Sequence, residues 1–135
     1  MNTLIGTITQ IQQSNAILLV DIDVDEHCFS ALLIESTTQL EWLSVGNKVK
    51  LIFKETEVSL AKNLSGLISL RNRLQCKVLT VQRGELLSKI TLKFKNYTVV
   101  SAITTRSVDA LQICVGDDID ALIKSNEISL MMINN

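Results

Sequence analysis

The sequence has few aromatic residues, no proline and no long hydrophobic run, and each shortage narrows the possible functions. Aromatic residues make up 4% of the 135 residues and hydrophobic residues 47%, so the core must consist of Ile, Leu and Val. The longest purely apolar run, Ala16 to Val20, is too short to cross a bilayer. The opening Met1-Asn2-Thr3-Leu4 lacks the basic segment of a signal peptide. We therefore expect a cytoplasmic protein that does not enter a membrane.

Residues that commonly carry chemistry are also scarce. His27 is the only histidine and follows Asp25-Glu26 in an expected turn, so a solvated side chain is favoured over a general base. No P-loop, dinucleotide fingerprint or zinc-ligand spacing is present. The odd number of cysteines, Cys28, Cys76 and Cys114, without a Cys-x-x-Cys pair, favours buried, reduced thiols. We expect no enzyme, no directly ligated metal cation and no organic cofactor.

The positive and negative charges of the chain are nearly balanced. The formal net charge is −1, so nothing global attracts nucleic acid or an anionic membrane. An anion-binding site, if present, must be local.

The chain contains an internal repeat with an offset of 70 residues. We interpret residues 1–62 and 67–135 as two copies of one small module. The linker around 61–66 is short and has no proline, so the copies should be coupled rather than free. The matching segments are Asn2-Thr3-Leu4 with Asn72-Arg73-Leu74, Val45-Gly46 with Val115-Gly116, Lys54 with Lys124, and Val58-Ser59-Leu60 with Ile128-Ser129-Leu130.

Alternating apolar residues predict five strands in each copy, with a short helix after the third strand. The helices are expected at 36–43 and after 107, ending near Ile113. This order is typical of a small Greek-key barrel of the oligonucleotide/oligosaccharide-binding (OB) type. We predict an all-β protein of two tandem five-stranded OB-like barrels. Because each half is near the lower size limit for a self-sufficient core, apolar surface should remain to be buried between halves or subunits.

A donor-rich, cationic set of residues lies at the ends of three segments of the second copy. Two cations, four hydroxyls and the N–H groups of a helix start suit a deprotonated tetrahedral oxyanion, which only accepts hydrogen bonds. No carboxylate lies in these segments. Each residue also has an ordinary role: Ser107 as a helix N-cap, the cations as solvated charges, Thr104 as a strand end. The set is Ser69, Arg71, Thr104, Ser107, Lys124 and Ser125.

Three segments of the second copy resemble the molybdate-binding Mop modules, also called TOBE domains. Ser69-Leu70-Arg71-Asn72 is similar to their Ser-x-Arg-Asn opening, and Ala102-Ile103-Thr104-Thr105-Arg106-Ser107 to their Ala-Ile-Thr-x-x-Ser segment. The run from Val115 to Ser125 is similar to Gly-x-x-Val-x-Ala-x-Ile-Lys-Ser. The resemblance implies molybdate or tungstate binding in the cytoplasm, with the anion between subunits. The resemblance also implies that Asn72 is a candidate residue. It further implies that a neighbouring module or subunit contributes Thr104 and Ser107.

The first copy departs from this pattern. Its segment 31–36 keeps Ser36 but has Ile34 at the Thr position, and Glu55 rather than Ser follows Lys54. A nearby carboxylate weakens an oxyanion site. Ser36 and Lys54 are therefore weaker candidates than the second-copy residues. A further departure is Cys76, which stands where the family usually has the glycine that Gly6 provides in the first copy.

The leading hypothesis is a cytoplasmic molybdate- or tungstate-binding protein for storage, homeostasis or sensing. By analogy it should be a homo-oligomer, with a trimer favoured over a dimer. One alternative is a nucleic-acid-binding tandem OB-fold protein, which would need basic stripes and stacking aromatics. Another is a regulatory or assembly module that acts without a ligand.

Overall fold

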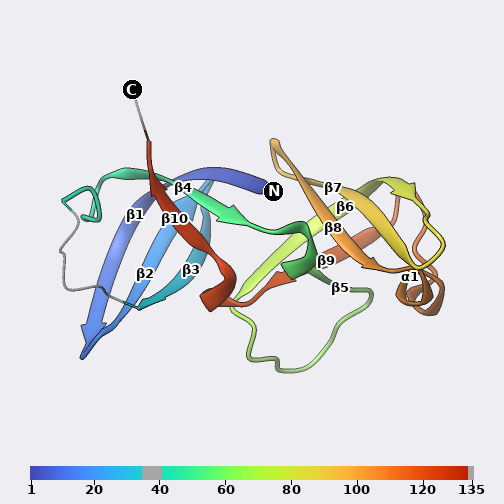
Figure 1. Cartoon of the computed structure of the whole chain (residues 1–135), viewed down its shortest axis with the longest axis horizontal. Coiled ribbons are helices and arrows are strands. Elements are labelled where there is room, and N and C mark those ends of the chain that lie inside the picture. Colours follow the sequence, from blue (N-terminus) through green and yellow to red (C-terminus); the bar gives the residue numbers. More distant parts are fainter. Residues whose placement is uncertain (35–40, 134–135) are drawn as a thin grey trace.

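Residues 1–34 and 41–133 are described by the computed structural model, and in them ten strands form two five-stranded antiparallel sheets (Figure 1). One α-helix and two short 3-10 helices connect the strands. The first half contains β1 (Asn2–Ser14), β2 (Ile17–Val24), β3 (His27–Ile34), β4 (Lys48–Phe53), η1 (Glu55–Glu57) and β5 (Ser59–Ala61). The second half contains β6 (Asn72–Gln82), β7 (Leu87–Phe94), β8 (Tyr97–Thr104), α1 (Thr105–Leu111), β9 (Asp118–Ile123), η2 (Ser125–Glu127) and β10 (Ser129–Met132).

The alternating apolar residues that predict the strands are the residues that are buried. Val20, Ile22 and Val24 of β2 are buried, as are Ile90 and Leu92 of β7, while the residues between them are at least partly exposed. A strand turns successive side chains to opposite faces, so one face of each strand contributes to the core. The prediction of a mostly β protein is confirmed.

The repeat extends to irregularities of the backbone. The pairing of β1 with β2 shifts register between Ile8 and Gln10, and that of β6 with β7 shifts between Val78 and Thr80. At each shift a glycine N–H donates to the strand, from Gly46 to the Ile8 oxygen and from Gly116 to the Val78 oxygen, both at 2.8 Å. Both glycines have positive φ, 95° and 92°, which favours glycine and explains the repeated Val-Gly pair.

The two copies exchange their closing strands. The sheet orders are β10-β4-β1-β2-β3 and β5-β9-β6-β7-β8, so β10 completes the first-copy sheet and β5 the second-copy sheet. In Figure 1 the red β10 runs beside the first-copy strands and β5 lies beside β9. The prediction of five strands per copy assigns each closing strand to its own copy, and this assignment is wrong. Periodicity identifies a strand but carries no information about which sheet edge the strand joins.

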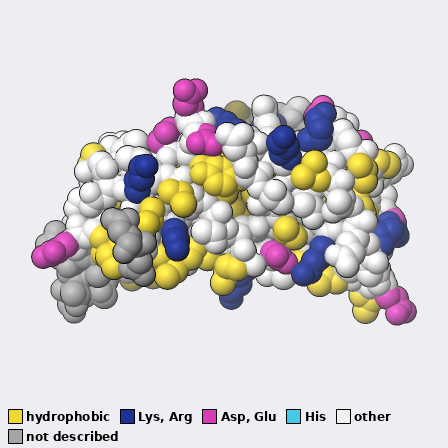
Figure 2. Space-filling model, turned by 90° about the horizontal axis from the view of Figure 1, so that it is seen from above, with side chains coloured by type: hydrophobic (Ala, Val, Ile, Leu, Met, Phe, Trp, Pro, Cys, Tyr) yellow, Lys and Arg dark blue, Asp and Glu magenta, His cyan; other side chains and the backbone are white. Residues whose placement is uncertain are grey.

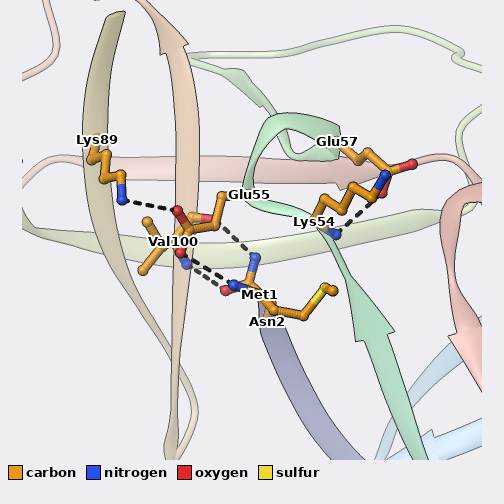
Figure 3. A network of polar contacts seen from close by, with 7 residues as sticks. All are labelled: Met1, Asn2, Lys54, Glu55, Glu57, Lys89 and Val100. Atoms are coloured by element: carbon orange, nitrogen blue, oxygen red, sulfur yellow. Dashed lines mark hydrogen bonds and ion pairs between the residues drawn. The ribbon is translucent and has the colours of Figure 1, made fainter. Parts of the chain in front are cut away.

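Two buried asparagines tie the copies together. Asn2 at the start of β1 donates to the Val100 oxygen and accepts from the Val100 N–H, both at 2.8 Å (Figure 3). Asn72 at the start of β6 donates to the Ser30 oxygen at 2.9 Å and accepts from the Ser30 N–H at 2.7 Å. Each first strand is thus bonded through a side chain to the third strand of the other copy. A buried amide paired on both sides satisfies backbone groups that would otherwise lack partners.

The core is one continuous cluster of buried side chains from both copies. It includes an aromatic contact between the copies, in which the Phe29 and Phe94 rings lie 6.0 Å apart. The His27 ring packs edge-on against both, at 5.2 and 5.3 Å. Burial, followed by the charge of Lys95, lowers the pKa of His27. The expectation of a solvated turn histidine was wrong, because the second copy covers this side chain.

Two smaller expectations also need correction. All three cysteines are free, but only Cys76 is buried, whereas Cys28 and Cys114 are exposed. The second-copy helix ends at Leu111 rather than near Ile113. Most of the helix expected at 36–43 lies outside the described residues. In the described part of the chain, no helix is both long and apolar enough to cross a membrane.

Candidate functional site

Arg71 and Lys124 leave the second-copy sheet side by side. Asn72 and Ile123 form the last rung between β6 and β9, and Arg71 and Lys124 are the next residue outward on each strand. Both are exposed. Lys124 has extended backbone (φ −68°, ψ 140°) and is followed at once by η2, which begins with Ser125. The structure therefore brings two cations and a hydroxyl residue, predicted from distant segments, to one rim of the sheet.

This second-copy rim faces the first copy. Because η2 packs against β3, a cavity of about 470 Å³ forms between them. Sequence reasoning missed the first-copy side of this cavity, since only the exchange of closing strands brings β3 next to Arg71. The lining residues are Arg71 and Ser125 from the second copy and Gln12, Leu19, Asp21, Cys28, Ser30 and Leu32 from the first.

The guanidinium of Arg71 is available for a ligand. Within residues 1–34 and 41–133 it has no ion pair and no hydrogen bond, unlike Arg73, which pairs with Asp120 at 2.8 Å. The cavity also contains the carboxylate of Asp21. Asp21 belongs to the first copy, so the prediction of a site without carboxylates, which rests on second-copy segments, does not hold for this cavity. Burial, then the charges of Asp21 and Asp23, raises the pKa of Cys28, and Arg71 opposes that shift.

The buried side chain of Asn72, next to Arg71 in the sequence, connects β3 and β9 beside the cavity. Its side chain is completely buried, and its amide group donates to the Ser30 oxygen and, at 3.0 Å, to the Ile123 oxygen. An amide nitrogen carries two hydrogens, and both are used here. The side chain therefore has no donor left for an anion. Its contacts hold β3 and β9 at the positions from which Ser30 and Lys124 reach the rim.

Thr104 and Ser107 lie elsewhere. The Thr104 hydroxyl accepts from the Ser107 N–H at 3.1 Å and lies 2.8 Å from the Ser107 hydroxyl. The N-cap is thus Thr104, which corrects the reading of Ser107 as the cap. Figure 1 shows α1 at one end of the molecule, whereas β6 begins near its middle. One chain therefore does not bring Thr104 and Ser107 to the Arg71 rim.

The remaining candidates are less informative. Ser69 is exposed, precedes Arg71 by two residues and does not line the cavity. Ser36 lies outside the described residues. Lys54 is the N-cap of η1, and its backbone N–H donates to the Glu57 carboxylate at 3.2 Å.

The last residue of η2, Glu127, has a raised pKa. Burial is the largest cause, followed by a hydrogen bond and the charge of Glu57, while Lys124 opposes the shift.

A larger cavity, of about 710 Å³, lies over β6 and β9 but fits an anion less well. Two of its charged residues, Lys77 and Asp118, pair with each other at 3.2 Å, and Asp120 pairs with Arg73. Its cations are therefore partly neutralised. Figure 2 shows basic, acidic and hydrophobic side chains interspersed on the upper face, with no basic stripe there of the kind that tracks a nucleic-acid backbone.

Comparison with known proteins identifies similar domains and folds. Residues 68–130 match the model of the TOBE domain. The molybdenum import ATP-binding protein ModC of Brucella abortus is 36% identical over 78 residues, which are 57% of this chain and 22% of that protein. The chain thus corresponds to about a fifth of that relative's length.

Two solved structures are also similar. The cytoplasmic molybdate-binding protein ModG, in a crystal form with molybdate bound, superimposes with a TM-score of 0.92 at 24% identity, over 98% of this chain and 96% of that one. A molybdate-binding protein from Sporomusa ovata is 34% identical and covers 52% of this chain and 100% of its own, with a TM-score of 0.46. The match to ModG shows that the whole chain shares its fold.

Proposed function

We propose that this chain, which carries a TOBE domain over residues 68–130, binds molybdate or tungstate at the cavity between the Arg71 rim and β3. It acts as a binding protein rather than an enzyme, in storage, homeostasis or sensing of the oxyanion in the cytoplasm. The names of its relatives support the ligand: ModG is a cytoplasmic molybdate-binding protein and ModC belongs to a molybdenum importer.

The observation that carries the proposal is the guanidinium of Arg71, which has no partner among residues 1–34 and 41–133, over a cavity that also holds Ser30 and Ser125. A deprotonated tetrahedral oxyanion accepts hydrogen bonds and donates none, so guanidinium and hydroxyl groups suit it. Hydrogen bonds between an ionised donor and an ionised acceptor are about twice as strong as neutral ones. Lys124, beside Arg71 at the end of the paired strand, adds a second positive charge.

The proposed site uses a second subunit. Thr104 and Ser107 are too far from Arg71 within one chain, so in the proposal another chain donates them. Exposed apolar residues flank both regions: Ile34, 87% exposed, ends β3, and Leu87, 51% exposed, pairs with Thr104. Burial of such residues would favour a homo-oligomer, a trimer first and a dimer second. Within each subunit we propose that the two sheets close into OB-like barrels, each completed by the other copy's last strand.

Removal of either cation should weaken oxyanion binding. A charge-assisted hydrogen bond contributes about 1.5–3 kcal/mol, so Arg71→Ala and Lys124→Ala should each lower molybdate affinity about tenfold or more. Lys77→Ala is the matched control, because Lys77 forms an exposed pair with Asp118 at the opposite end of the β6–β9 pairing from Arg71. Calorimetric titration measures the affinities, and native mass spectrometry with added molybdate reports the subunit number. Unchanged affinity in both rim variants would reject the site.

A further inference from the structure

The first copy has a rim built on the same plan as the Arg71 rim. Asn2 and Phe53 form the last rung between β1 and β4, and Lys54 follows that rung as Lys124 follows Ile123. Each lysine then leads into a 3-10 helix, η1 or η2, that packs against the third strand of the other copy. The first residue of η1 is Glu55 and the first residue of η2 is Ser125. Glu55 thus occupies the place that Ser125 has at the cavity.

A basic residue faces Glu55 where the second-copy cavity has an apolar one. Leu19 lines that cavity and pairs with Gln12 across β1 and β2, whereas Lys89 pairs with Gln82 across β6 and β7. Gln82 and Lys89 follow Gln12 and Leu19 by 70 residues, so Lys89 is the counterpart of Leu19. The first-copy rim therefore has a cation that the second-copy rim lacks.

The Glu55 carboxylate is held between positive groups. It lies 3.3 Å from the Lys89 ammonium and 3.5 Å from the Met1 amino group, and 25% of its side chain is exposed (Figure 3). Partial burial raises the pKa of Glu55, but the hydrogen bond and charge of Lys89, with the Met1 amino group, lower it overall. Glu55 is therefore ionised at neutral pH, and it neutralises the cations of this rim.

We infer that the Glu55 carboxylate acts as a built-in anion that closes the first-copy rim to oxyanions. Each chain then has one oxyanion site, at Arg71, although the repeat provides two positions. This inference rests on the proposed function only for the identity of the ligand. The serine at the equivalent position of the second copy indicates the change that opens the closed rim.

Glu55→Ser is expected to create a second binding event that depends on Lys89. Calorimetric titration of molybdate should give about one additional equivalent per chain for Glu55→Ser, and the double variant Glu55→Ser/Lys89→Ala should lose it. Glu85→Ser removes the same charge from an exposed position and should keep the wild-type stoichiometry. Glu55→Gln, which keeps the side-chain volume, should also gain the event and replaces Glu55→Ser if that variant fails to fold.

The outcomes separate this inference from the proposed function. If the wild type binds molybdate through Arg71 and both folded Glu55 variants keep its stoichiometry, the inference is overturned and the proposed function stands. If the wild type does not bind molybdate, the proposed function is overturned, and a Lys89-dependent event in Glu55→Ser would still support the inference. Absence of binding in every variant would reject both.

Discussion

The two copies have similar contacts with each other but differ in the residues at their rims. Asn2 and Asn72 make equivalent contacts to the opposite copy, and both copies bulge at the same position. At the rims, by contrast, the copies differ. The second-copy rim has Ser125 and Leu19 where the first-copy rim has Glu55 and Lys89. The exchange of closing strands constrains both copies, because each sheet is completed by a strand of the other copy. A side chain at a rim has few packing contacts. A charged residue can therefore replace a neutral one at one rim without loss of the fold.

The largest loss of stability is expected when either of the two asparagines is replaced. Asn72→Ala leaves the Ser30 N–H and oxygen and the Ile123 oxygen without their partner, and each unsatisfied buried group costs about 1–3 kcal/mol. Asn2→Ala breaks only the two bonds found to Val100. Both variants should lower the free energy of unfolding, Asn72→Ala more. Urea denaturation measures the free energy of unfolding. Equal losses in the two variants would show that the additional bond of Asn72 to Ile123 does not add to stability.

A smaller effect is expected where the copies differ inside the core. A Cβ added to Gly6 would lie 2.6 Å from the Asp23 oxygen and 2.6 Å from Ile22 Cγ2, whereas the second copy accommodates the buried side chain of Cys76 at the equivalent position. Overpacking typically costs about 1–3 kcal/mol. Thermal unfolding should show Gly6→Ala clearly less stable than wild type, and Cys76→Ala changed less. The reverse order would mean that the first copy relaxes around the added carbon.

The smallest perturbation is chemical labelling of the three thiols without mutation. Burial raises the pKa of Cys76 to about 12, so at pH 8 it carries almost no thiolate, the reactive form, in the folded protein. The pKa of Cys28 is also raised, so this exposed thiol should react more slowly than Cys114. Mass spectrometry after brief alkylation gives this order. Because Cys28 lines the cavity, molybdate should slow its labelling further, and no slowing would place the ligand elsewhere.

The second-copy side of the candidate site could be predicted from the sequence, but the first-copy side could not. Arg71 and Lys124 could be grouped because both stand at the ends of expected strands, and the sheet pairs those ends. Asp21 and Cys28 carried no such signal, since they sit in the middle or near the start of ordinary alternating strands. Thr104 was grouped with Arg71 because both lie at the ends of expected segments of the second copy, but the length of the second sheet separates them within one chain.

The strands, the repeat and the rim cations could be predicted from residue patterns alone, because side-chain alternation and Val-Gly turns are local properties of the backbone. Three features became visible in the folded chain: which copy each closing strand joins, the use of both Asn72 amide hydrogens within the protein, and the position of Glu55 between Lys89 and the Met1 amino group. Those outcomes depend on contacts between residues about 30 to 100 positions apart. Such contacts follow from the packing of complete sheets, which no local pattern records.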